Sequence, residues 1–182
     1  MWRRQQGEHH LPTTNGKDTD MKRLFKMNVW CRIGVLYLGA MLMGNFVWET
    51  LHLPLYTLWK SSTTAYLAFA VVHCSGGDLM IGASALFAAT VLVGREGRSR
   101  NFGCVAFLTI GFGLAYTVFS EWLNVSVRGS WAYAADMPVV PFLGIGLSPI
   151  LQWIVVPGLS FMWARNQKLF ALPWASAAKN AE

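Results

Sequence analysis

Charged residues are scarce in this chain, and several long stretches contain none. Of the 182 residues only 13% are charged, while 54% are hydrophobic. In a soluble globular domain about a quarter of the residues are charged, so a monomer that dissolves in water is not expected. The hydrophobic residues gather in segments long enough to cross a lipid bilayer. There are four such segments: residues 33–56, 65–94, 102–125 and 139–164.

This pattern predicts an all-α polytopic membrane protein, in which four transmembrane helices form a bundle over residues 33–164. Residues 1–20 are polar with little to bury, so we expect them to be disordered. Residues 21–32 alternate basic and apolar side chains, as an interfacial lead-in does. No apolar segment with a small-residue cleavage site precedes the first span, so a cleaved signal is not expected. Residues 165–182 form a short tail.

The sequence lacks the motifs of several enzyme classes. It contains no P-loop, no Cys-x-x-Cys, no His-Glu-x-x-His and no Gly-x-Ser-x-Gly. A nucleotide-driven machine is therefore not expected. The three cysteines, Cys31, Cys74 and Cys104, are an odd number and none lies in a predicted outer loop. No disulfide framework follows from them.

Basic residues are almost absent from one side of the predicted bundle. Of the 15 lysines and arginines, all except Lys60 and Arg128 lie before the first span, between spans two and three, or after the fourth. The positive-inside rule then predicts that both termini are cytoplasmic. We expect the membrane to be the plasma (inner) membrane. The net charge of +6 is accordingly expected to face anionic lipid rather than nucleic acid.

Two of the spans carry polar residues with the same spacing. Asn45, Glu49 and His52 fall on one face of the first predicted helix, because they are about one turn apart. The third span repeats the spacing with Thr117, Glu121 and Asn124. A carboxylate in hydrocarbon is costly enough to indicate a function. Further polar candidates are His73, Asp78, Trp131, Tyr133 and Gln152.

No lysine or arginine falls inside the spans, so Glu49, Asp78 and Glu121 have no fixed cationic partner. Their charge must be met by protonation, by a histidine, by water or by a bound cation. In one interpretation a carboxylic acid beside a histidine is an acid–base pair. In the other, a divalent metal ion is held by two carboxylates and two imidazoles. Those ligands would be Glu49, His52, His73 and Glu121.

Two spans are expected to be irregular. The second has more residues than a bilayer core needs, and we predict a bend over residues 73–78, with Asp78 capping a new helix after the glycine pair. In the fourth, Ser148 followed by Pro149 is typical of an N-cap and first helical position. Residues 139–147 would then be a re-entrant or irregular piece.

The function predicted first is a membrane-embedded enzyme that acts on a lipid-soluble substrate in the outer half of the bilayer. Its catalytic residues would be Glu49, His52, His73, Glu121 and Asn124. One alternative is a proton- or ion-coupled carrier that works as a dimer, with Asp78 and His73 as the relay. Another is an accessory subunit of a membrane complex, because a glutamate at the end of a span is also a common edge residue and polar stripes can serve helix association alone.

Overall fold

The computed structural model describes residues 15–167, with side chains for residues 30–94 and 101–167. The chain divides into two units, residues 1–32 and 33–182. The first unit contains the start of helix α1 (Asn15–His52), so residues 15–20 are helical where disorder was predicted. The remainder of that prediction, residues 1–14, and most of the C-terminal tail lie outside the described residues.

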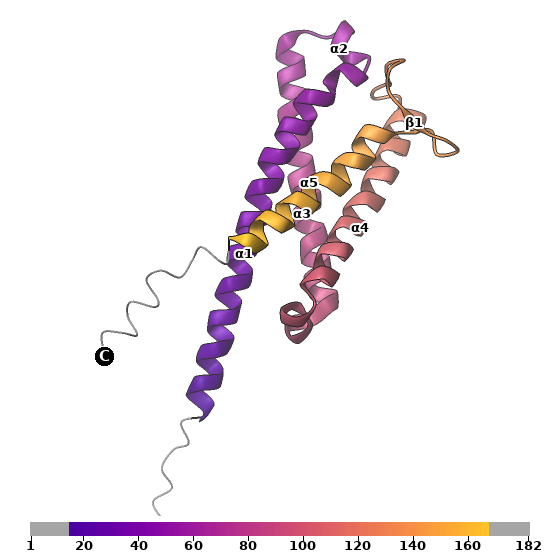
Figure 1. The fold of residues 1–182 in the computed structure, drawn as a ribbon. Helices are drawn as coiled ribbons and strands as arrows, with labels where there is room; N and C mark the ends of the chain where they lie inside the picture. The colour runs from indigo at the N-terminus through magenta and orange to yellow at the C-terminus, as the bar shows by residue number, and fades with distance from the viewer. Residues whose placement is uncertain (1–14, 168–182) are drawn as a thin grey trace, which may run out of the picture. The chain divides into compact units, whose positions relative to one another are not determined.

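Within the second unit the chain is almost entirely helical (Figure 1). After α1 come η1 (Leu53–Leu55), α2 (Leu58–Ser61), α3 (Thr64–Arg100), α4 (Phe102–Glu121), η2 (Trp122–Val127), β1 (Val139–Val140), β2 (Ile145–Gly146) and α5 (Leu147–Asn166). In the described part of the chain, four helices are long and apolar enough to cross a membrane: Trp30–Leu55, Thr64–Gly94, Phe102–Val127 and Leu147–Asn166. The predicted four-helix membrane bundle is confirmed.

Helices α1, α3 and α4 each bury a narrow stripe and expose apolar side chains elsewhere, whereas half of α5 is buried. Val35, Leu51 and Phe107 are 72%, 74% and 76% exposed, as lipid-facing residues of a membrane helix are. The buried stripe of α1 is Ile33, Tyr37, Met41, Asn45, Glu49 and His52. The buried stripe of α4 is Val105, Thr109, Gly113, Thr117 and Glu121. On both helices these residues recur about once a turn, which is why one face serves as the contact surface.

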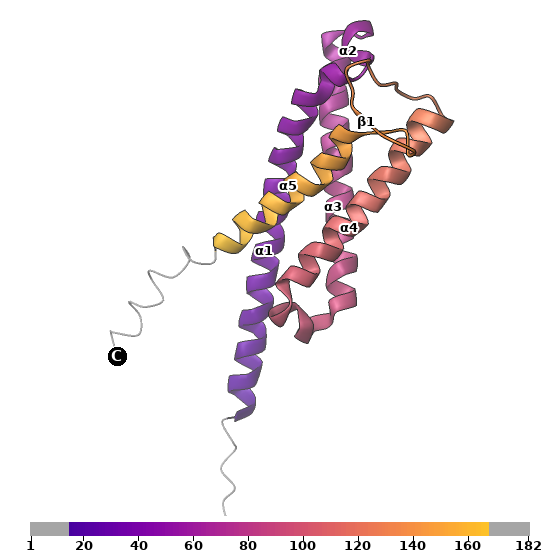
Figure 2. The same ribbon diagram turned by 45° about the vertical axis from the view of Figure 1, so that its right-hand side comes forward.

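Helix α5 packs tightly on its neighbours because glycines face it. A Cβ atom at Gly113 of α4 would stand 1.9 Å from the Trp153 ring of α5, and one at Gly44 of α1 would stand 2.8 Å from Val156. Figures 1 and 2 show α5 running obliquely across the bundle. Close approach of this kind is the usual role of small residues in membrane helices. It brings the polar face of α5 against the stripe of α1.

The predicted bend in the second span is wrong. Helix α3 is continuous through residues 73–78, and its one residue with non-helical dihedral angles is Gly94 (φ 70, ψ 170). A break in a membrane span would leave backbone N–H and C=O groups unpaired in hydrocarbon, so the helix continues through the glycine pair. Asp78 therefore caps no helix, and its side chain is free to meet residues of α1 and α5.

The fourth span does not begin at residue 139, and its helix begins within one residue of the predicted start at Ser148. Val139–Val140 pairs antiparallel with Ile145–Gly146, so residues 139–146 form a β-hairpin rather than part of a span. Helix α5 begins at Leu147 with Gly146 as its N-cap. Ser148 lies one residue inside the helix and is not its cap. The pairing of the two short strands gives part of this segment's backbone its hydrogen-bond partners without a helix.

The loop after α4 is fastened to the end of α1. Helix α4 continues as a π-helical turn, η2, and the chain then returns to the segment after α1. There Thr57 N–H donates to the Ala132 carbonyl (3.0 Å) and Ala134 N–H donates to the Leu55 carbonyl (2.8 Å). Tyr56 and Tyr133 form a β-bridge between these bonds. This pairing places the loop residues Trp131 and Tyr133 over the polar end of the bundle.

Candidate functional site

Gln152 is the centre of a buried polar cluster. Its Nε2 atom lies 3.1 Å from Asn45 Oδ1, 2.9 Å from Glu49 Oε1 and 2.9 Å from Asp78 Oδ2. An amide nitrogen carries two hydrogens, so it donates to two of these three oxygens at a time. The three acceptors come from α1 and α3, so one side chain of α5 links three helices through polar groups.

Glu49 also contacts the histidine of its own stripe. His52 Nε2 lies 3.0 Å from Glu49 Oε2, and His52 Nδ1 lies 3.0 Å from Ser148 Oγ. Trp48 Nε1 donates to the same hydroxyl oxygen at 3.2 Å. If the carboxylate accepts from Nε2–H, then Nδ1 has no proton and must accept from the Ser148 hydroxyl. The donors then run in one direction, from Trp48 through Ser148 and His52 to Glu49.

Asp78 joins the cluster from α3. Its Oδ2 atom accepts from Gln152 Nε2 at 2.9 Å, and its carboxyl group lies near the side chains of Glu49 and Trp153. Two neighbouring carboxylates repel each other when both are ionised. The Gln152 amide is a donor that the carboxyl groups of Glu49 and Asp78 share.

Glu121 forms a second part of the site, beneath the loop. The Tyr133 hydroxyl donates to Glu121 Oε2 at 2.5 Å. The buried indole N–H of Trp131 also interacts with this carboxyl group, although its geometry falls short of a hydrogen bond. Glu121 is close enough to interact electrostatically with His52 and Glu49. The two acidic stripes thus meet, and Thr117 lies buried one turn below Glu121.

Two loop-side tyrosines keep their protons in this setting. Burial raises the pKa of Tyr133, and its hydrogen bond to Glu121 raises that pKa further. Burial likewise raises the pKa of Tyr56, to which the negative charge of Glu121 adds. The two rings lie 5.6 Å apart, and Tyr56 is also 5.3 Å from the His52 ring. Tyr133 is therefore a stable hydrogen-bond donor to Glu121.

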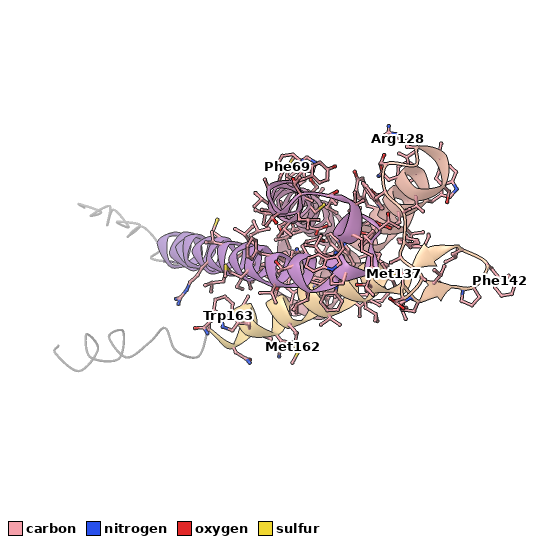
Figure 3. All side chains as sticks on the ribbon, turned by 90° about the horizontal axis from the view of Figure 1, so that it is seen from above. Phe69, Arg128, Met137, Phe142, Met162 and Trp163 are labelled. Atoms are coloured by element: carbon pink, nitrogen blue, oxygen red, sulfur yellow. The ribbon has the colours of Figure 1, made fainter. Side chains whose placement is uncertain are left out.

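The structure does not bring His73 into this cluster. Its ring is exposed and stacks on Phe69 at 5.4 Å, and Phe69 lies on the outer side of the bundle (Figure 3). Because α3 does not bend, positions 73 and 78 project about 140° apart, at 3.6 residues per turn. Asp78 faces inward, so His73 cannot. The expected convergence of His73 with the other site residues is wrong.

Asn124 is also outside the cluster. Its amide donates to the Ser120 carbonyl at 2.9 Å, and its oxygen accepts from the Ser130 hydroxyl at 3.4 Å. These bonds close the end of η2, so the third residue of that stripe holds the helix end. No group of three or more His, Cys, Asp or Glu side chains in the described part of the chain is placed to hold a metal ion. The four ligands predicted for a metal therefore do not assemble.

Three residues of the site were not among the sequence candidates, namely Trp48, Ser148 and Trp153. Ser148 was interpreted as a helix cap. One signal was available for Ser148, because it precedes Gln152 by one helical turn and shares its face. For the tryptophans no such signal exists, since a belt tryptophan and a buried donor look alike in sequence.

The polar cluster is confined to one half of the bundle. Toward the other end aromatic rings pack together: the Tyr37 ring stacks on Phe161 at 4.1 Å, and Phe161 packs edge-on against Phe102 at 5.7 Å. Ala89 and Val105 are completely buried at the same end, and the buried Thr109 and Ser160 bond to the backbone of their own helices. Asn45 Nδ2, Ser75 Oγ and Tyr37 Oη are buried without a hydrogen-bond partner. The site therefore has a polar part, a largely apolar floor and spare donors on its walls.

These contacts give a site rich in acid and base groups, with a tyrosine and an amide that orient them. Comparison of the chain with protein-family models, with curated proteins and with solved structures finds no match.

Proposed function

We propose that this integral membrane protein is an enzyme that moves protons to and from a lipid-soluble substrate, such as an isoprenoid, a quinone or a lipid. His52 is the proton-transferring base and acid, and Glu49 is the carboxylate that balances its charge. Glu121, with its donor Tyr133, is a second acid facing the same space. Asn45 and Gln152 orient the carboxyl groups. From the distribution of basic residues, the site lies in the outer half of the plasma (inner) membrane.

The observation that carries this proposal is the contact of His52 with Glu49 and Ser148 at once. Both ring nitrogens are engaged at 3.0 Å, so the ring is held in one orientation. Histidine is the commonest acid–base group of enzymes. Holding the ring in place costs conformational entropy. A histidine that only lies at the end of a span does not need to be held in this way.

The apolar floor favours an enzyme over a carrier. A proton carrier needs polar groups that reach both faces of the membrane in turn. Here the polar side chains that are hydrogen-bonded between helices lie in one half. In the other half Tyr37, Phe161 and Val105 are buried, and the buried hydroxyls of Thr109 and Ser160 bond to the backbone of their own helices. A substrate that arrives and leaves through the same half of the bilayer fits this arrangement, as does an apolar substrate that diffuses in the lipid.

The test is a comparison of membrane lipid extracts from cells with the wild-type protein, Glu49→Gln or His52→Asn. Both variants are expected to accumulate the same lipid-soluble compound, as a deletion strain does, because the proton-transfer pair is broken. Thr50→Ala is the matched control, since the Thr50 hydroxyl is exposed and bonds to its own helix at the Phe46 carbonyl (2.8 Å).

Two results would contradict the enzyme. Unchanged lipid extracts, together with a lower melting temperature of Glu49→Gln, would mean that the cluster serves assembly alone. Uptake into liposomes that depends on a pH gradient and disappears in Asp78→Asn would mean that the protein is a carrier. Metal analysis of the purified protein distinguishes acid–base chemistry from the metal interpretation of the same residues.

A further inference from the structure

Relative to His52 and Glu49, the hydroxyl group of Ser148 has the position of the nucleophile in a hydrolytic triad. It lies 3.0 Å from one ring nitrogen of His52, whose other nitrogen lies 3.0 Å from Glu49. A serine, a histidine that takes its proton and a carboxylate that holds the histidine make up the arrangement that activates a serine hydroxyl. Such an arrangement is recognised by geometry rather than by the order or spacing of its members. The missing Gly-x-Ser-x-Gly motif therefore does not count against it.

Donors for a developing oxyanion surround the same hydroxyl. The Trp48 indole N–H is 3.2 Å from Ser148 Oγ, within reach of an oxygen on a carbon bonded to that atom. Ser148 also lies in the first turn of α5, where backbone N–H groups have no partner within the helix and the dipole favours negative charge. The N–H of Leu147 is already bonded to the Pro138 carbonyl at 2.7 Å. The Ser148 N–H is left as the second donor, and such donors stabilise a tetrahedral oxyanion.

This triad lies beside the lipid-facing surface of α1. Trp48 is only half-buried, and Val47 and Leu51 on either side of it are 52% and 74% exposed. An acyl chain that lies in the bilayer along these residues can bring its carboxyl carbon to the level of Ser148. This route is apolar up to the edge of the polar cluster and is then rich in hydrogen-bond donors. It matches an ester whose acyl part is hydrophobic.

We propose that Ser148 is a catalytic nucleophile and that the substrate is a hydrophobic acyl ester of the bilayer. This inference rests on the proposed function, since it uses the Glu49–His52 pair for proton transfer. Ser148 Oγ attacks the ester carbonyl carbon, the electron pair of the double bond moves to the carbonyl oxygen, and the hydroxyl proton passes to His52 Nδ1. Collapse re-forms the carbonyl and breaks the bond to the alcohol oxygen, which takes the proton from Nδ1. Water or another hydroxyl then attacks the acyl-serine by the same steps and returns the proton to Ser148.

The experiment is covalent labelling of the full-length protein in lipid nanodiscs with an alkyl fluorophosphonate, followed by mass spectrometry of the labelled peptide. The wild-type protein is expected to carry the label on Ser148. Labelling should fall at least about tenfold in Ser148→Ala, His52→Asn and Glu49→Gln, because triad members act as a unit. Ser160→Ala is the matched control. That serine is also buried in α5, but its hydroxyl donates to the Val156 carbonyl at 2.7 Å, so its loss should leave labelling unchanged.

The outcomes separate this inference from the function on which it rests. Absence of label on Ser148 in wild-type protein with a cooperative melting transition overturns the nucleophile. If the lipid extracts still change in Glu49→Gln, acid–base catalysis stands and Ser148 only positions His52. Label on Ser148 that is as strong in His52→Asn as in the wild type also overturns the triad. The wild-type result decides even if Ser148→Ala does not fold.

Discussion

The amide nitrogen of Gln152 lies 2.9 Å from Glu49 Oε1 and 2.9 Å from Asp78 Oδ2, so one uncharged side chain of α5 joins the acidic residues of α1 and α3. The lysines and arginines of the spans, Arg32 and Arg165, lie near the far ends of the first and fourth spans. Two carboxyl groups on separate helices repel each other when both are ionised. The common amide donor of Gln152 stands where a soluble protein would use a cation.

Gln152→Met should destabilise the protein by about 1–3 kcal/mol, because it keeps the volume of the side chain and leaves buried acceptors unpaired. The measurement is unfolding in detergent micelles, followed by circular dichroism. The control is Leu151→Met, at the adjacent and lipid-exposed position of the same helix. If the two variants unfold alike, Gln152 does not hold the carboxyl groups.

Gly113→Ala should destabilise the bundle by about 1–3 kcal/mol, the usual cost of overpacking, and by more if Trp153 cannot move. The added methyl group would lie 1.9 Å from the Trp153 ring. Since Trp153 also contacts Asp78, its displacement should disturb the site as well. Gly111→Ala on the same helix is the control, because nothing lies within 4 Å of a Cβ atom there. Thermal unfolding of both variants side by side tests the difference, and equal melting temperatures would contradict the packing.

The spans and the inward stripes could be predicted from the sequence because they depend on local patterns. Hydropathy finds the four helices, and helical periodicity puts Asn45, Glu49 and His52 on one face. The stripe of α4 was predicted by the same argument as far as Glu121. Where it failed, at Asn124, the chain leaves the regular α-helix for η2, and periodicity no longer describes which way a side chain points.

The contacts between helices could not be predicted in this way. The face that α3 turns inward depends on whether residues 73–78 bend. That face decides whether His73 or Asp78 joins the site. Which residue of α5 meets α1 depends on where α5 begins, and the hairpin at residues 139–146 sets that point. The pairing of Ser148 with His52 joins residues far apart in the chain. Such long-range pairs follow from packing, which no local pattern encodes.

Tyr133→Phe should weaken the alkaline dependence of stability. Burial and then the hydrogen bond to Glu121 raise the pKa of Tyr133, whereas in the unfolded chain it ionises near about 10. The folded state therefore keeps a proton that the unfolded state releases. Its contribution to stability is complete below about 10 and is lost as the pH rises from there toward the folded pKa.

The measurement is the free energy of unfolding as the pH rises from about 9 to about 12. Tyr133→Phe should show a smaller loss than the wild type over this range, with Tyr56 responsible for what remains, since its pKa is also raised by burial and by Glu121. At neutral pH the variant should be the less stable of the two, because Glu121 loses its donor. An unchanged alkaline slope would mean that Tyr133 is exposed in the folded protein.

A comparison of the two histidines in the spans, His52 and His73, distinguishes most clearly between a residue of the site and a residue of the helix surface. His52→Gln should lower the rate of the proposed reaction by about 10²–10⁴-fold, because glutamine cannot carry the transferred proton. His73→Gln should change stability by no more than about 0.5 kcal/mol and leave the reaction intact, since its ring lies on the exposed face of α3 against Phe69. Lipid extracts measure the reaction of both variants, and melting curves measure their stability. A loss of conversion in His73→Gln equal to that in His52→Gln would mean that α3 presents its other face, because a straight helix cannot turn both His73 and Asp78 toward Gln152.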